Sequence, residues 1–130
     1  MNEYEQHARD GRIRQPVATD GTLLRFDIVE EVSRLKSEQP WQADHTANTL
    51  VKYSDLRIVL ISLKAGARLH EHQTAGRLAI QALSGEILVH VEAEVIEMSA
   101  GKLLALDRDV LHEIEAKTDS VFLLTIVWPK

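Results

Sequence analysis

The sequence predicts an all-β fold, an antiparallel barrel or sandwich with a jelly roll among the candidates, preceded by one short helix. The first observation is a succession of short apolar segments, separated by turn residues, from residue 49 onward. The second is that the segment just before them has helical spacing instead. The third is size, because 130 residues with 45% hydrophobic and 27% charged residues suit one globular domain.

The helix is predicted over residues 27–38, DIVEEVSRLKSE. Its apolar residues recur at helical spacing and form one face, made by Ile28, Val32 and Leu35. Asp27 is placed to cap the first turn. Gln39-Pro40 ends the helix, because the residue before a proline disfavours helical backbone.

The strands are predicted from apolar or alternating runs bounded by turn residues such as Gly66, Gly85 and Gly101. Their ranges are 49–53, 56–63, 68–72, 78–83, 86–91, 94–98, 102–106, 112–116 and 120–128. Alternation along these strands is expected to fill the barrel interior with Leu60, Ile80, Leu104 and Leu124 or their neighbours.

Two regions are expected along the chain. Residues 1–25 are read as an N-terminal arm, loose or ordered against a neighbouring subunit, because their first part is polar and carries Gly and Pro. Residues 26–130 form the single β-barrel domain. A homodimer is predicted in which the partner covers an exposed edge strand.

Charge and composition limit the classes of partner that the protein is expected to bind. The net charge is -5 and no basic block offsets it, which argues against nucleic-acid binding and against a polybasic membrane anchor. No apolar stretch reaches the roughly 18 residues that span a bilayer, and the N-terminus has no signal-peptide pattern. A cytoplasmic protein that binds a small molecule is therefore expected.

The residue types present also limit the chemistry. The chain has no Cys, which excludes disulfides, thiolate metal sites and a Cys nucleophile. It contains no Gly-rich phosphate loop and no serine-hydrolase motif. Any metal would have to be held by His and by carboxylate or amide oxygen.

Two histidines of the predicted 68–72 strand point to a metal site. In a regular strand, residues two apart share a face at a separation of about 6.6 Å, so His70 and His72 are expected to face one cavity while Glu71 faces away. That geometry suits chelation of a cation. A third histidine, His112, follows the turn after the 102–106 strand.

The order of these features resembles the two-part signature of the cupin superfamily, and the resemblance covers residues from about 56 to 128. The residues that carry it are Gly66-x-x-x-His70-x-His72, then Gly85, then Gly101-KLLAL-Asp107-x-Asp109-x-x-His112. In cupins the first motif provides two His and usually a Glu, and the second provides another His, inside a small β-barrel. The resemblance therefore implies His70, His72 and His112 as ligands of a divalent metal ion.

The sequence departs from the cupin pattern at the position of the usual Glu ligand. Counted from His72, the usual Glu falls on Gly76 or Arg77, and counted back from Gly85 it falls on Leu78. The carboxylate ligand is thus absent. In the second motif, Asp107 and Asp109 replace the usual Pro and Gly of the turn, and Asp is itself a good turn former.

Three imidazoles without a carboxylate leave the charge of a divalent ion uncompensated, which favours an anionic co-ligand. The metal is expected to be Fe, Mn, Zn or Ni, and no other cofactor is predicted. The resemblance implies a dioxygenase, or a Lewis-acid lyase or isomerase, acting on a small anionic molecule. No residue is assigned as a catalytic acid or base. Arg77 is a candidate to reach an anion at the cavity mouth, although an Arg that begins a strand is more commonly a surface residue.

A second interpretation uses the same residues. The barrel could bind or sense a small molecule without metal and without chemistry, with the histidines as polar lining of the pocket. Whether the protein is an enzyme stays open at this point.

Overall fold

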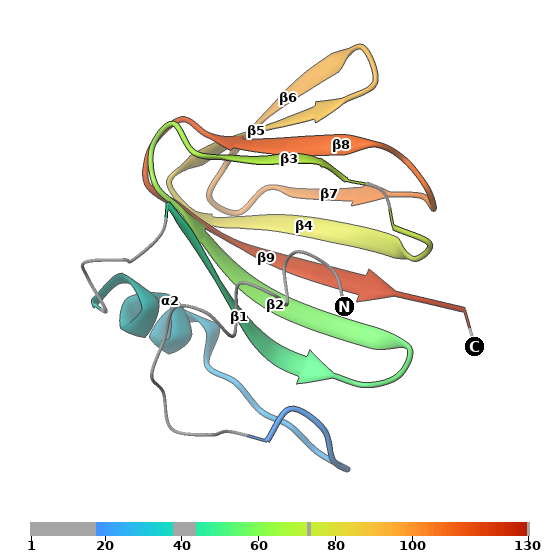
Figure 1. Ribbon diagram of the computed structural model, residues 1–130. Helices are drawn as coiled ribbons and strands as arrows, with labels where there is room; N and C mark the ends of the chain where they lie inside the picture. The colour runs from blue at the N-terminus through green and yellow to red at the C-terminus, as the bar shows by residue number, and fades with distance from the viewer. Residues whose placement is uncertain (1–17, 38–43, 73, 130) are drawn as a thin grey trace.

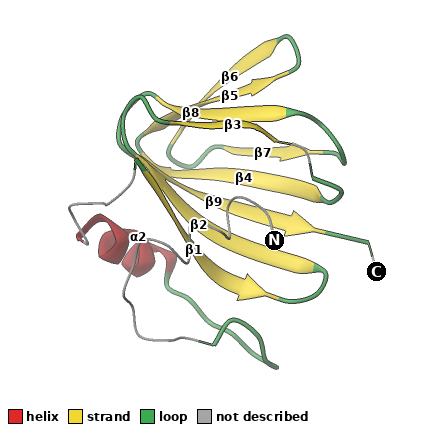
Figure 2. Ribbon diagram, viewed as in Figure 1, coloured by secondary structure: helices red, strands yellow, loops and turns green. Residues whose placement is uncertain are grey.

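The computed structural model describes residues 18–37, 44–72 and 74–129, with the side chains of residues 71 and 72 outside the description. The described residues form one helix and two antiparallel sheets (Figures 1 and 2). The elements are α2 (Ile28–Ser37), β1 (His45–Lys52), β2 (Leu56–Leu63), β3 (Arg68–His72), β4 (Arg77–Ser84), β5 (Glu86–Val91), β6 (Glu94–Ser99), β7 (Leu103–Leu106), β8 (His112–Ala116) and β9 (Ser120–Val127).

Successive strands alternate between the two sheets from β2 to β5 and again from β6 to β9. One sheet has the order β1-β2-β9-β4-β7 and the other the order β3-β8-β5-β6. Every neighbouring pair is antiparallel, and partners such as β2 and β9 lie far apart in the sequence. This arrangement confirms the predicted all-β, jelly-roll type of barrel with a short helix before it.

The strand boundaries follow the sequence pattern closely. β2, β3, β5 and β8 have the predicted bounds, whereas β1 begins at His45, earlier than residue 49. The extra residues of β1 pair with the end of β2, where Thr46 lies opposite Ser62. Because these extra residues are mostly polar, the apolar pattern did not predict them as part of the strand.

A buried apolar cluster fills the space between the sheets. It includes Ile80 and Leu124 as predicted, both 0% exposed, and Leu104 packs against it. Leu60 is the exception. It is equally buried but lies on the other face of β2, and its neighbours Val59 and Ile61 occupy the interior instead.

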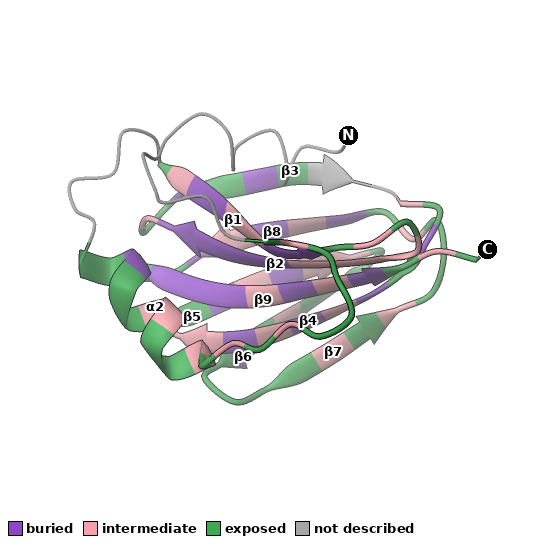
Figure 3. Cartoon of the chain, turned by 90° about the horizontal axis from the view of Figure 1, so that it is seen from below, coloured by how far each residue is buried: buried purple, intermediate pink, exposed green. Residues whose placement is uncertain are grey.

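Helix α2 explains where Leu60 goes. The helix packs on the outer face of the five-stranded sheet, where Leu35, 1% exposed, joins Leu60 in a second apolar cluster. Figure 3 shows buried residues running along β2 and β9 beside α2. Since this sheet is covered on both faces, its central strands are apolar almost throughout rather than alternating.

The start of the helix is as predicted. Asp27 caps it, because its carboxylate accepts a hydrogen bond from the backbone N–H of Glu30 at 3.1 Å. Glu30 and Glu31 lie in the first turn, where acidic side chains favour the helix dipole. The predicted stop at Gln39-Pro40 lies outside the described residues.

The part of the predicted arm that the structure describes lies along the same sheet. The carbonyl of Thr19 accepts a hydrogen bond from the N–H of Lys52 at 2.7 Å, and Tyr53 donates its hydroxyl to the carbonyl of Gly21 at 2.6 Å. Leu24 joins the second cluster. The division of the chain at residue 25 stays a prediction.

Among the described residues, no helix is both long and apolar enough to cross a membrane.

Candidate functional site

The strands that carry the predicted ligands have their ends together at one end of the barrel, here called the histidine end. There β3 ends at His72, β8 begins at His112, β4 begins at Arg77 and β9 ends at Val127. The backbone register makes His72 the direct partner of His112, and Arg77 the partner of Val127. In Figure 1 these strand ends lie together on the right.

His112 is buried on the inner face of β8, with 1% of its surface exposed. Its Nδ1 lies 3.1 Å from the carbonyl oxygen of Val110, an acceptor, so Nδ1 carries the proton and the lone pair is on Nε2. Burial lowers the pKa of His112 below its ordinary value of 6.5, and the hydrogen bond to Val110 offsets this only in part. His112 is therefore mainly neutral at pH 7.

His70 lies on the opposite face of the same sheet. Its side chain is 83% exposed, and its Nδ1 is 3.8 Å from a carboxylate oxygen of Glu113. His70 follows Leu69, which is 1% exposed and pairs with the interior residue Ile114, so alternation turns His70 outward. Between the pairs Leu69–Ile114 and His72–His112, β3 has one more residue than β8. Such a bulge interrupts the alternation on which the shared face of His70 and His72 was predicted.

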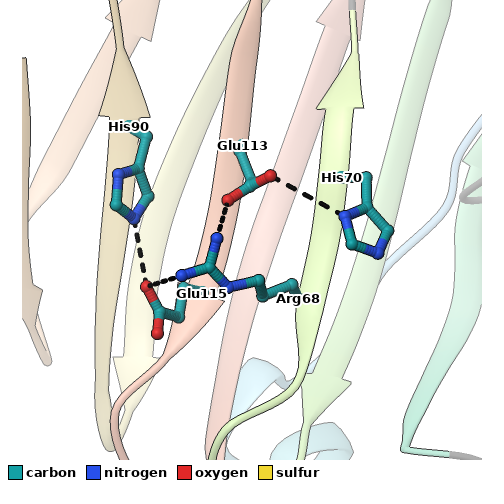
Figure 4. Close-up of polar contacts among 5 residues, drawn as sticks. All are labelled: Arg68, His70, His90, Glu113 and Glu115. Atoms are coloured by element: carbon teal, nitrogen blue, oxygen red, sulfur yellow. Dashed lines mark hydrogen bonds and ion pairs between the residues drawn. The ribbon is translucent and has the colours of Figure 1, made fainter. Parts of the chain in front are cut away.

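The outer face around His70 carries a polar network (Figure 4). The guanidinium of Arg68 donates to the carboxylates of both Glu113 and Glu115, the second at 3.2 Å. Nε2 of His90 lies 3.1 Å from Glu115. On the outer face of the four-stranded sheet, His70 thus has carboxylate and guanidinium neighbours. An open hollow of about 380 Å³ borders this network.

The position of the missing acid is filled by other groups. Leu78 is 4% exposed and belongs to the barrel core. Arg77 is a surface residue, the more common role of an Arg that begins a strand, and it donates from Nε to Asp107 at 2.9 Å. Among the described residues, no group of three His, Cys, Asp or Glu is arranged to hold a metal ion.

The structure therefore brings together the positions of His72 and His112 and sets His70 apart from His112. The side chain of His72 lies outside the described part of the chain. A site made of all three histidines stays a prediction.

The turn before β8 shows what the Asp replacements do. Asp109 has a φ of 61°, a left-handed conformation that Asp tolerates better than most residues and that Gly adopts freely. Its N–H donates to the carbonyl of Thr74 at 2.9 Å, which ties this turn to the loop after β3. The pKa of Asp107 lies below its ordinary value of 3.8, mainly because its carboxylate accepts a hydrogen bond from the backbone N–H of Arg108. The hydrogen bond and the positive charge of Arg77 lower this pKa further.

Sequence reasoning missed one charged residue on the inner face, Arg57. It stands in the otherwise apolar strand LRIVLISL, two positions before Val59. A charge in such a run was the available signal, but only the faces of β2 show which way the residue points.

No protein-family model matches the sequence, and no curated protein matches it. The fold, however, is shared with solved structures. A conserved Streptococcus pyogenes protein of unknown function superposes with a TM-score of 0.70 at 21% identity, over 92% of this chain and 99% of that one. A cupin superfamily protein from Desulfitobacterium hafniense gives 0.64 at 19% identity, over 65% and 78%.

An enzyme is also among the similar structures. The salicylate 1,2-dioxygenase of Pseudoaminobacter salicylatoxidans, solved in complex with gentisate, superposes with a TM-score of 0.62 at 19% identity. The match covers 76% of this chain and 30% of that one. At such identities the likeness concerns the fold, and together with the two-sheet barrel it makes this chain a small β-barrel of the cupin fold.

Proposed function

We propose that this protein is a small metal-binding cupin in which a divalent ion, held by His72 and His112, binds a small anionic molecule inside the barrel. The observation that carries the proposal is the state of His112. It is buried, its ring is mainly neutral, and its Nδ1–H is directed to the carbonyl of Val110. Metal-binding histidines commonly donate their second nitrogen to a backbone carbonyl in this way.

The cross-strand register supports a second ligand at His72. Residues directly opposite one another in an antiparallel pair present their side chains on the same face, about 5 Å apart at Cβ. In the backbone register, His72 is the partner of His112. His70, the third predicted ligand, would join them only if β3 lost its bulge.

An ion held by neutral imidazoles keeps its positive charge, so it would attract an anion and act as a Lewis acid or, as iron, bind oxygen. The similarity in fold to a salicylate 1,2-dioxygenase is compatible with the second role. The residues of this chain would keep the site apolar and dry, since Leu78 and Ile114 line the neighbouring interior at 4% and 0% exposure.

The second candidate function is a barrel that binds a small molecule without metal. The outward orientation of His70 favours it, because that orientation removes one of the three predicted ligands. A homodimer and a cytoplasmic location are proposed alongside either function.

The test is the metal content of the purified protein, measured by plasma mass spectrometry beside three single variants. His72→Ala and His112→Ala should each lose the metal, whereas His70→Ala should keep most of it. Loss in all three would instead support the complete three-histidine site. No metal after incubation with iron, manganese, zinc and nickel would refute the proposal and leave the metal-free barrel.

A further inference from the structure

The inner face of the barrel carries a positive charge where β2 begins. Val59 and Ile61 belong to the interior cluster, whereas Leu56 and Ile58 pack toward α2 on the outer face. Arg57 alternates with the first pair and therefore lies on the inner face. Its partner on β9 is Ile126, which is 0% exposed and also part of the interior cluster.

Arg57 lies at the histidine end. The pair next to it joins Leu56 to Val127, and Val127 is also the partner of Arg77, with which β4 begins. β2 thus begins at the same end of the barrel at which β3 ends and β8 begins, as Figure 1 shows. The guanidinium and the buried ring of His112 consequently belong to the same end of the interior.

Trp128 holds the guanidinium in place. The Cζ atom of Arg57 lies 5.1 Å from the centroid of the Trp128 ring, within range of a cation–π contact. The backbone N–H of Trp128 donates to the carbonyl of Asp55 at 3.0 Å, which ties the backbone at Trp128 to the turn before β2. Stacking engages the face of a guanidinium, whereas a carboxylate binds its N–H edge, so Arg57 can do both.

A second cation lies next to Arg57 in the sheet. Lys52, at the end of β1, is the cross-strand partner of Arg57, and its side chain is exposed to solvent. Arg57 is therefore the cation of this pair that lies toward the barrel interior.

From this geometry we propose that Arg57 binds a carboxylate group of the small molecule that enters the barrel at the histidine end, with Trp128 stacked against the guanidinium. The inference rests on the proposed function for the presence of a small anionic ligand. It names a carboxylate because the planar fork of a guanidinium matches that group with two parallel hydrogen bonds. Arg77, also at this end, is excluded because it lies outside and binds Asp107.

The experiment measures carboxylate binding with Trp128 as the reporter. In a Trp41→Phe background Trp128 is the one remaining tryptophan of the chain. Benzoate, succinate and pyruvate are titrated in chelator, each beside its neutral amide, by fluorescence and calorimetry. At least one carboxylate should bind and its amide should not, and Arg57→Gln should weaken binding about tenfold or more.

Two further variants make the result specific. Arg57→Lys keeps the charge but loses the fork, so it should retain part of the affinity. Arg77→Gln is the matched control, an arginine at the same end whose removal should leave carboxylate affinity unchanged. Circular dichroism checks that each variant is folded. The inference is overturned if none of the carboxylates binds the parent protein, if Arg57→Gln binds as well as the parent, or if Arg77→Gln weakens binding equally.

Metal content, measured on the same proteins before chelator is added, separates this inference from the proposed function. Arg57→Gln should lose carboxylate affinity and keep the metal content of the parent protein. A protein that takes up no metal but binds a carboxylate through Arg57 would refute the metal site and uphold this inference. A protein that binds metal but no carboxylate would uphold the metal site and refute this inference.

Discussion

His70 and His112 lie on opposite faces of the four-stranded sheet. His70 is 83% exposed in its side chain, whereas His112 is 1% exposed on the inner face. The two motif histidines therefore have different environments, although both belong to the pattern that resembles a metal site. This relationship can be tested without any ligand.

Chemical modification should distinguish the two rings. Diethyl pyrocarbonate reacts with accessible, neutral imidazole, so His70 should be modified rapidly in the folded protein and His112 slowly. Peptide mass spectrometry after brief exposure measures both rates. The rates should become similar in urea, which serves as the control, and equal rates in the folded protein would contradict the placement of His70.

The stability of the metal-free protein should depend on the protonation of His112. Burial lowers the pKa of His112 in the folded state below 6.5. The unfolded chain therefore binds more protons in this range, and the free energy of unfolding should fall as the pH falls through about 6.5 and below.

Urea denaturation in chelator between pH 8 and pH 5 measures this dependence. In His112→Gln the part due to the buried ring should disappear, so its profile should be flatter than that of the parent protein. His90→Gln, which removes a partly exposed imidazole from the outer face, is the control. Parallel profiles for the parent protein and His112→Gln would show that the ring is not buried in its neutral form.

Gly85 is required at the turn between β4 and β5. It has a φ of 76°, and a Cβ there would lie 2.3 Å from the carbonyl oxygen of Asp119. Gly85→Ala should lower the free energy of unfolding by more than left-handed backbone strain alone, which is about 1 to 2 kcal/mol, because the added Cβ would also clash with the main chain. Gly101→Ala, with a φ of 93° and open space around it, should cost the strain alone. Equal losses in denaturant titrations would contradict the close approach at Gly85.

Helix α2 should be part of the cooperative unit. Leu35 is 1% exposed against the outer face of the five-stranded sheet, so Leu35→Ala should lower the free energy of unfolding by about 2 to 5 kcal/mol. Val29→Ala on the same helix, where the side chain is 81% exposed, should change it by about 0.5 kcal/mol at most. A small effect at Leu35 would mean that the barrel is stable without its helix.

Much of the fold follows from local patterns in the sequence. The helical spacing of Ile28, Val32 and Leu35, the cap at Asp27 and the turn residues predicted the helix start and several strand boundaries directly. These features depend on neighbours along the chain, because backbone propensity, capping and turn chemistry act within a few residues. The motif pattern likewise directed attention to His112.

The tertiary structure decided which face each residue occupies. Alternation along β2 is a local property, but only the positions of α2 and the second sheet place Arg57 and Val59 inside and Leu60 outside. In β3 the bulge between Leu69 and His72 changes the phase of the alternation, and a bulge is defined by the register with a partner strand. The relation between positions 70 and 72 consequently depends on the pairing of β3 with β8, a strand distant in the sequence.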